Sequence, residues 1–447
     1  MPTADLIVRD TTVLTMNANF DVLAHHDVAI SGQFITAVTP TGSGQSGVEG
    51  SQAPLAKKLL DGRGLILMPG LVNAHTHLGM SLFKGTAAAA DLFDWLDWTG
   101  RHQKKMGPDD AYWSVMLAAV EMIRAGVTTF ADMFFKQEAT ADAIADAGLR
   151  ACLGEGIMEP FGEAGRGEAV DAQIDGAIQF IEKCQGMADG RISAWLAPHS
   201  LYACSERAIT RVLEVASALN APIQTHLSET IKEVEDSIVR HGCHPPQRME
   251  ELGMLEHRVL AAHCVHLSPS DIEILDRPTF GVAHNPGSNL KLQSGLAPLL
   301  QLMGRKMAVG LGTDGNGSED TLDILKAVYL ASVIHPWTRE LRPAHSVLAM
   351  ATREGARALG LEDEIGTVEV GKKADLILID LGHHPRTTPL NNPYYNLAFT
   401  ARGDDVVTSI VDGQILMEDR VVKSLDEKEV LRQAQRCADR IIGDDSL

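Results

Sequence analysis

The middle of the chain alternates short apolar runs with longer amphipathic stretches. Eight runs have the length and composition of strands, and they lie at residues 72–77, 127–132, 150–154, 192–198, 222–226, 259–263, 279–283 and 307–312. Helix signals stand between them: Gly126 closes the stretch 111–124, Ser205 opens 205–219, and Ser268-Pro269 with Asp271 opens another helix. Regular strand and helix alternation makes a parallel sheet, and eight such units over residues 67–366 predict a closed (β/α)8 TIM-like barrel in an α/β protein.

The two ends of the chain share a different pattern. Residues 5–39 alternate apolar and polar positions between turn residues, which indicates a meander of antiparallel strands. Residues 374–380 have a similar strand pattern, and residues 406–416 predict a β-hairpin with its turn at Asp412-Gly413. We therefore expect a second, small β-sandwich domain built from residues 1–66 and 367–447, with the barrel of residues 67–366 inserted between them.

Composition and charge narrow the classes of partner. The 447 residues are 45% hydrophobic, enough for a large core, and the net charge of −20 repels phosphate backbones and argues against nucleic acid. No apolar run approaches the ~20 residues needed to span a bilayer, and the N-terminus lacks a leader pattern, so we expect a cytoplasmic protein with no membrane partner. Six scattered cysteines without Cys-x-x-Cys spacing favour reduced thiols. We also expect a small-molecule substrate and a homo-oligomer.

The strand ends carry the chemistry. His75 and His77 close the first strand, and because side chains alternate along a strand they point the same way while Thr76 points back. Further ligand-type residues follow the later strands, and these are His199, His226, Glu229, His263, His266, His284 and Asp314. Buried ionisable groups are costly without partners, so this recurrence at one end of a parallel barrel predicts a site for a cation of the zinc or iron type.

Several motifs resemble a known family. They are Met68–Gly85 (MPGLVNAHTHLGMSLFKG), 226–230 (HLSET), 262–266 (AHCVH), 284–292 (HNPGSNLKL), 311–315 (LGTDG) and 371–376 (GKKADL). Together they are similar to the metal-dependent amidohydrolase superfamily, and within it to the deaminases of 5'-methylthioadenosine, S-adenosylhomocysteine and adenosine. Guanine deaminases and s-triazine hydrolases share the same skeleton.

The resemblance implies a site for one divalent ion, Zn²⁺ in the first place with Fe²⁺ as the alternative. Its ligands would be His75, His77, His226 and Asp314, an imidazole and carboxylate set that lowers the pKa of a bound water. It further implies that Glu229 is the proton shuttle between the water and a ring nitrogen of the substrate. His263 would hydrogen-bond the water, and Asp314 would accept its second proton.

The resemblance also implies substrate contacts. His199 corresponds to a histidine that contacts purine and ribose, Glu229 contacts the ring, and Trp98 belongs to an aromatic segment, 91–98, that closes over the ligand. Gln103 stands where nucleoside-specific members have a glutamate for the ribose hydroxyls. Glu155 stands where an arginine would meet a homocysteine carboxylate, although Arg166 is available in the following loop.

We therefore interpret the chain as a hydrolytic deaminase of a 6-aminopurine nucleoside, which it would convert to the inosine analogue and ammonia. Gln103 and Glu155, which differ from the residues expected at these two positions, favour adenosine or methylthioadenosine over S-adenosylhomocysteine. The alternative is an amidohydrolase of another heterocycle, a guanine, pterin or s-triazine aminohydrolase or chlorohydrolase. A more remote one is a metal-binding protein without catalysis, which would not need Glu229 beside the four ligands.

Overall fold

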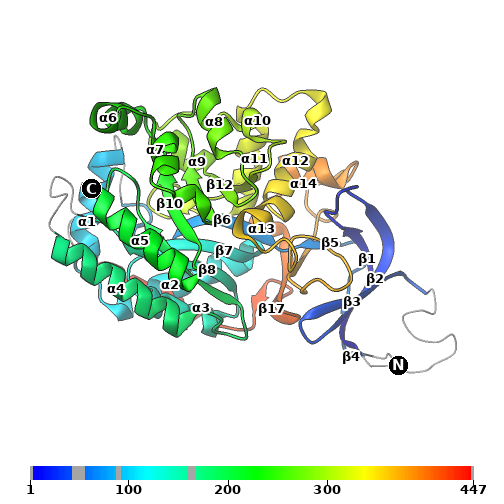
Figure 1. Ribbon diagram of the computed structural model, residues 1–447. Helices are drawn as coiled ribbons and strands as arrows, with labels where there is room; N and C mark the ends of the chain where they lie inside the picture. Colours follow the sequence, from blue (N-terminus) through cyan, green and yellow to red (C-terminus); the bar gives the residue numbers. More distant parts are fainter. Residues whose placement is uncertain (1–3, 43–55, 87–91, 160–166, 444–447) are drawn as a thin grey trace. The chain divides into compact units, whose positions relative to one another are not determined.

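The computed structural model describes residues 4–42, 56–86, 92–159 and 167–443 (Figure 1). The chain forms two compact units, one of residues 1–72, 120–129 and 323–426 and the other of residues 73–119, 130–322 and 427–447. The boundaries that we derived from the sequence, 1–66 with 367–447 and 67–366, differ from this division and stay a prediction.

The first unit is built on a sheet with strands from both ends of the chain. Its order is β18-β17-β16-β15-β5-β1-β2-β3, with β4 paired to β1. These strands are β1 (Ala4–Leu14), β2 (Val22–Ser31), β3 (Phe34–Pro40), β4 (Ala56–Asp61), β5 (Ile66–Pro69), β15 (Leu376–Ile379), β16 (Val406–Val411), β17 (Gln414–Glu418) and β18 (Val421–Val422). The two ends meet where β5 pairs antiparallel with β15, Leu67 opposite Leu378. Both side chains are buried in the core of this sheet, so a second sheet built from both ends of the chain is present, as expected.

The predicted hairpin at Asp412-Gly413 is present. It joins β16 to β17, with Val411 paired to Gln414. Both turn residues have positive φ, 48° at Asp412 and 73° at Gly413, as a two-residue hairpin turn of this type requires. A side chain at Gly413 would collide with the carbonyl oxygen of Gly32, 2.2 Å from the ideal Cβ position, so glycine is needed here for space as well.

The second sheet is the predicted barrel. Its order is β13-β12-β11-β10-β9-β8-β7-β6-β14, and β14 follows β13 along the chain and pairs parallel with β6, so the sheet closes on itself. The strands are β6 (Leu71–His77), β7 (Val127–Phe134), β8 (Arg150–Ile157), β9 (Ile192–Pro198), β10 (Ile223–Leu227), β11 (Val259–His263), β12 (Phe280–His284), β13 (Ala308–Leu311) and β14 (Asp314–Gly315). The first eight of these strands agree with the eight predicted ones to within three residues at each end, and β14 was not predicted as a strand.

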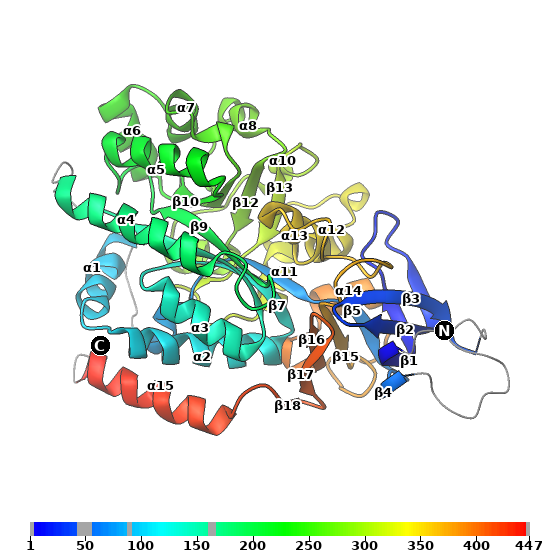
Figure 2. The ribbon, with the colours of Figure 1, turned by 60° about the horizontal axis from the view of Figure 1, so that its bottom comes forward.

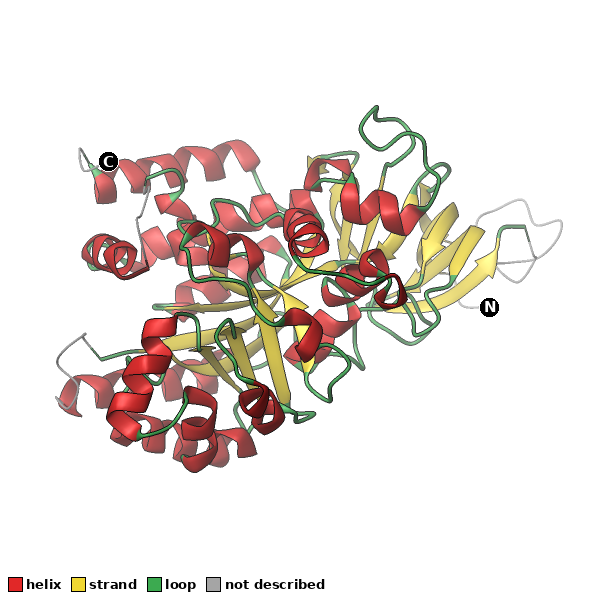
Figure 3. Cartoon of the chain, turned by 90° about the horizontal axis from the view of Figure 1, so that it is seen from above, coloured by secondary structure: helices red, strands yellow, loops and turns green. Residues whose placement is uncertain are grey.

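Helices stand between successive strands of the barrel along the chain, and further helices follow β14 (Figure 3). They are α1 (Leu92–Gln103), α2 (Pro108–Ala125), α3 (Gln137–Ala147), α4 (Gly167–Cys184), α5 (Glu206–Leu219), α6 (Ile231–His241), α7 (Pro245–Glu251), α8 (Pro269–Leu275), α9 (Pro286–Lys291), α10 (Leu299–Leu302), α11 (Ile324–Ile334), α12 (Pro343–Met350), α13 (Arg353–Leu359), α14 (Pro393–Phe399) and α15 (Glu427–Ile442). The predicted starts are confirmed at two of them, because Ser205 accepts the N–H of Ala208 and Ser268 forms a capping box with Asp271.

The C-terminal helix α15 belongs to the barrel unit, where Figure 2 shows it alongside α2. The Lys105 ammonium donates to the carbonyl of Ile441 at 3.0 Å, and Arg440 forms an ion pair with Asp110. Cys437 and Ile441 are buried in the same apolar cluster as Phe83 and Trp98. The strand-rich pattern of the preceding residues gave no sign of this association. Among the helices of the described residues, none is long and apolar enough to cross a bilayer.

Candidate active site

Strand β6 presents two histidine rings to the inside of the barrel. Every residue of the strand is buried, and the rings of His75 and His77 lie edge to face with their centroids 4.7 Å apart. The intervening Thr76 points the other way and donates to Asp132 Oδ1 of β7 at 3.0 Å. The same oxygen accepts the N–H of Leu78 at 2.6 Å, so Asp132 fixes the strand end that carries both histidines.

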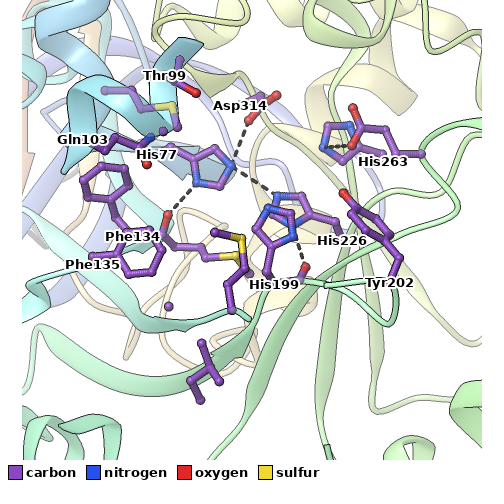
Figure 4. A pocket seen from close by; sticks show the side chains of 17 residues that line it. His77, Thr99, Gln103, Phe134, Phe135, His199, Tyr202, His226, His263 and Asp314 are labelled. Carbon is purple, nitrogen blue, oxygen red and sulfur yellow. Dashed lines mark hydrogen bonds and ion pairs between the residues drawn. The ribbon is translucent and has the colours of Figure 1, made fainter. Parts of the chain in front are cut away.

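Four ligand-type atoms converge next to this strand end, and Figure 4 shows three of the residues that carry them, His77, His226 and Asp314. His77 Nε2 lies 3.3 Å from His226 Nε2, which comes from the end of β10. Asp314 Oδ1, in β14, lies 3.2 Å from His77 Nε2 and 3.6 Å from His75 Nε2. The predicted metal ligands are therefore brought together from three places in the sequence.

The hydrogen bonds of these rings leave bare nitrogen lone pairs facing one another. His77 Nδ1 donates to the carbonyl of Met133 at 2.5 Å, and His226 Nδ1 donates to the carbonyl of His199 at 2.7 Å. With Nδ1 as the donor, each neutral ring presents an unprotonated Nε2. The Nε2 atom of His75 is buried and has no hydrogen-bond partner among the described residues. Facing lone pairs and a buried acceptor without a donor fit a shared cation, and backbone carbonyls on the outer nitrogens orient the rings as they do in metal sites.

The electrostatics agree with this fit. Burial lowers the pKa of His75 to about 4 and that of His226 well below its usual range, so both rings are neutral as metal ligands must be. At His77, burial acts to lower the pKa but the neighbouring Asp314 carboxylate outweighs it and raises it. Burial acts to raise the pKa of Asp314, yet its histidine contacts hold it well below the usual range. The carboxylate therefore attracts positive charge to this point.

Asp314 is held by its second oxygen. Ser288, in the short helix α9, donates its hydroxyl to Asp314 Oδ2 at 2.6 Å, and both residues are buried. The N–H of Gly315 donates to Asp314 Oδ1 at 2.7 Å. Asp314 itself has a φ of 61°, a conformation that non-glycine residues rarely adopt and that needs such support.

Glu229 and His263 form a buried pair beside the four ligand-type atoms. Glu229 Oε2 lies 3.7 Å from His263 Nε2, and its Oε1 accepts the hydroxyl of Ser294 at 3.3 Å. His263 Nδ1 lies 2.8 Å from Asn289 Oδ1, so the proton on Nδ1 is engaged and Nε2 faces Glu229. Burial raises the pKa of Glu229, while His263 opposes the shift. A carboxyl group with a raised pKa can both accept and release a proton near neutral pH.

A pocket opens from this pair. Among the predicted substrate contacts it includes His199, Gln103 and Glu229. Its other lining residues include a largely apolar wall, which consists of Met80, Met133, Phe134, Phe135, Ile157 and Met158. No lysine or arginine lines it in the part of the chain that the structure describes. Such a lining suits a flat heteroaromatic ring with an uncharged substituent.

Two residues that the sequence placed near the substrate lie elsewhere. Trp98 is not among the lining residues: it is 7% exposed, stacks on His102 with ring centroids 4.2 Å apart and belongs to the apolar cluster that α15 completes. Glu155 accepts the N–H groups of Lys136 and Gln137 at 3.0 and 2.7 Å, so it caps the start of α3 and does not line the pocket. The Glu155 carboxylate therefore faces the start of α3 and not the pocket. Arg166, like Asp91 of the aromatic segment, lies outside the described residues.

Sequence reasoning missed the residues that hold the site in place. Ser288 and Asn289 support Asp314 and His263, and the strand-end signal that revealed the histidines extends to them because they lie in α9, which begins two residues after the end of β12. Asp132, at the end of its predicted strand, carried the same signal. The carbonyl groups of Met133 and His199 gave none, since main-chain acceptors are present in every residue.

Comparisons with known proteins agree with this geometry. A model of the amidohydrolase family matches residues 66–416. A 5-methylthioadenosine/S-adenosylhomocysteine deaminase from Pelotomaculum thermopropionicum is 39% identical over 445 residues, which cover 98% of this chain and 99% of that protein. A 5'-deoxyadenosine deaminase from Methanosarcina acetivorans is 38% identical over 445 residues, with the same coverage of 98% and 99%. The crystal structure of an adenosine deaminase from Xanthomonas campestris with bound zinc has a TM-score of 0.89 and 31% identity, covering 98% of each chain. The chain, matched along nearly its whole length by such relatives, belongs to the amidohydrolase family.

Proposed function

We propose that this protein is a hydrolytic deaminase of adenosine-type nucleosides that uses one divalent metal ion, preferably Zn²⁺. The observation that carries the proposal is the convergence of three imidazoles and one carboxylate beside the buried pair of Glu229 and His263. The pocket that leads to this pair has room for a heteroaromatic ring among apolar side chains. The relatives named as deaminases of methylthioadenosine, S-adenosylhomocysteine and 5'-deoxyadenosine support the same class of substrate.

The ion would be held by His75, His77, His226 and Asp314. When bound, it would supply Lewis-acid chemistry and lower the pKa of a water molecule. Glu229 accepts a proton from the attacking water and delivers it to the ring nitrogen next to the amino-bearing carbon. A C–O bond forms at that carbon, the C–N bond to the amino group breaks, and the products are the 6-oxopurine nucleoside and ammonia.

Three neighbours assist this proton transfer. His263, with Nδ1 engaged by Asn289, directs Nε2 to the same space as Glu229 and can hydrogen-bond the water. The carboxylate of Asp314 can accept the second proton of the water and pass it to the amino group, which leaves as ammonia. His199 faces the pocket next to His226, their ring centroids 4.4 Å apart, and is positioned to contact the purine nucleoside.

Within this class we propose adenosine, methylthioadenosine and 5'-deoxyadenosine as better substrates than S-adenosylhomocysteine. The described pocket lining offers apolar side chains and no cation to pair with the carboxylate of a homocysteine tail. An uncompensated charge in a closed pocket is costly. Gln103 lines the pocket at the position assigned to the ribose hydroxyls, and as a neutral amide it can donate and accept.

Ammonia release from the purified, metal-loaded protein tests both levels of the proposal. The panel contains adenosine, methylthioadenosine, 5'-deoxyadenosine, S-adenosylhomocysteine, guanine, a pterin and an aminotriazine. We expect the three adenosine derivatives with uncharged 5' groups to give the highest kcat/KM. A clear preference for S-adenosylhomocysteine refutes the finer proposal, and turnover of only guanine, pterin or triazine moves the protein to the other-heterocycle alternative. The Arg166→Ala substitution should lower the turnover of S-adenosylhomocysteine alone.

We also expect the protein to be a homo-oligomer, which size-exclusion chromatography would test.

A further inference from the structure

We propose that Glu233 is a positioning residue that fixes Glu229 through its main chain. The two carboxylate oxygens of Glu233 accept the N–H groups of Ser228 and Glu229, each at 2.8 Å. The Glu233 residue is only 5% exposed. The inference rests on the proposed function, because it takes Glu229 as the proton shuttle.

The contact departs from an ordinary helix cap. Glu233 is the third residue of α6, whose N-cap is Thr230, and Thr230 Oγ1 accepts the N–H of Glu233 at 3.2 Å. In a capping box the third residue returns to the N–H of the N-cap. Here the side chain reaches past the cap to the two residues that follow β10. The rigid first turn of α6 is thereby joined to the main chain of Glu229.

The peptide between Ser228 and Glu229, whose N–H donates to Glu233, is also tied to the residues that follow β11. The carbonyl of Ser228 accepts the N–H groups of Val265 and His266, at 3.1 and 2.9 Å. Ser228 has a φ of 50° and His263 has a φ of 73°, so both turns adopt a conformation that requires support from neighbours. Glu233 holds one side of this connection. The separation of 3.7 Å between Glu229 Oε2 and His263 Nε2 therefore depends on the placement of Ser228 and its neighbours.

A role in packing alone would not call for a carboxylate at this position. Burial acts to raise the pKa of Glu233, and the N–H groups of Ser228 and Glu229, which favour the carboxylate form, act to lower it. An apolar side chain would fill the same space without the desolvation of a charged group. The two amide donors are the feature that a carboxylate satisfies, one with each oxygen.

The first test is Glu233→Gln, which replaces one acceptor oxygen by an NH₂ group facing an N–H. We expect kcat for the best nucleoside of the panel to fall at least ~10-fold, since small displacements of a catalytic group have large effects on rate, while KM and metal content are unchanged. The matched control is Glu235→Gln, the same substitution at an exposed position of the same helix, which should leave kcat within about twofold. A Glu233→Gln enzyme with kcat within about twofold of the wild type, or a loss of kcat that follows a loss of metal, overturns the proposal.

A double variant separates positioning from general support of the fold. In the Glu229→Gln background the shuttle is already absent, so adding Glu233→Gln should change the residual kcat by less than about twofold. If the loss caused by Glu233→Gln is the same in both backgrounds, Glu233 does not act through Glu229 and the proposal is wrong. Failure of the proposed function looks different, because the wild type would then release no ammonia from adenosine derivatives.

A second variant covers the case in which Glu233→Gln does not fold. Glu233→Asp keeps the charge but is one methylene too short to reach both amides, and the same criteria apply to it. Circular dichroism and thermal melting of the metal-loaded proteins establish folding. If neither variant folds, Glu233 is a requirement for folding and not for the placement of Glu229, which also overturns the proposal.

Discussion

Ser288→Ala tests how the candidate metal site is supported. The hydroxyl of Ser288 donates to Asp314 Oδ2 at 2.6 Å, and the substitution removes this donor from a carboxylate that is 5% exposed. The other oxygen of Asp314, which faces His75 and His77, keeps its contacts. The variant should therefore leave all four proposed ligands in place but lose the hydrogen bond that orients one of them.

The expected magnitude follows from the charge and burial of this contact. A hydrogen bond to a buried charged group contributes ~2 kcal/mol, which corresponds to a factor of ~30 in an equilibrium constant. The loss divides between two states. In the metal-free protein, Asp314 can move and regain part of the lost interaction free energy, and only the part that it does not regain lowers the free energy of unfolding. The part that it regains is lost again when Asp314 returns to the metal, and this part appears as weaker metal binding. We expect at least a ~10-fold rise in the dissociation constant of Zn²⁺, within the usual range for groups that orient a ligand.

Two measurements follow both parts. Titration of Zn²⁺ against a competing chelator gives the change in metal affinity, and urea denaturation of the metal-free protein gives the change in unfolding free energy. Their sum should be ~2 kcal/mol. Ser332→Ala is the matched control, because Ser332 is also buried and donates to the carbonyl of Val328 at 2.7 Å without contacting a candidate ligand. A Zn²⁺ dissociation constant within about twofold of the wild type would refute the role that we assign to Ser288.

Three further predictions concern the reaction itself. Replacing His75 or Asp314 by alanine should remove the metal together with activity, because a site of four ligands becomes weaker and misshapen when one ligand is lost. Elemental analysis of the wild-type protein should find about one metal ion per chain. Two ions per chain, or an enzyme that is active without metal, would contradict this prediction. Glu229→Gln should lower kcat at least ~10²-fold with metal content kept, and near-normal turnover would exclude Glu229 as the shuttle. Burial raises the pKa of Glu229 above the ordinary glutamate value of ~4.3. As the pH falls through this raised pKa, Glu229 becomes protonated and can no longer accept a proton, so kcat/KM should fall there. A decrease in kcat/KM that begins only at or below pH ~4.3 would contradict the assignment of Glu229 as the shuttle.

The barrel and the set of residues at its rim could be predicted from local patterns in the sequence. Apolar runs and helix caps are local patterns, and the observed strands follow them closely. Alternation along β6 is also local, so His75-Thr76-His77 was sufficient to place two rings on one face and to predict that residues at other parallel strand ends would join them. His226 and Asp314 do so although they lie far away along the chain.

Which side chains complete the pocket and which support it depends on how the elements pack against one another. Whether Trp98 faces a ligand or the core depends on what packs beside α1, and that includes α15, more than 300 residues later in the chain. Glu155 turns to the amides of α3 because a buried carboxylate takes the nearest donors. Ser288 and Asn289 each act through one hydrogen bond to another element, and Glu233 acts through two. Such contacts depend on distances that no periodic pattern of the sequence encodes, because they are set by how the strands and helices pack.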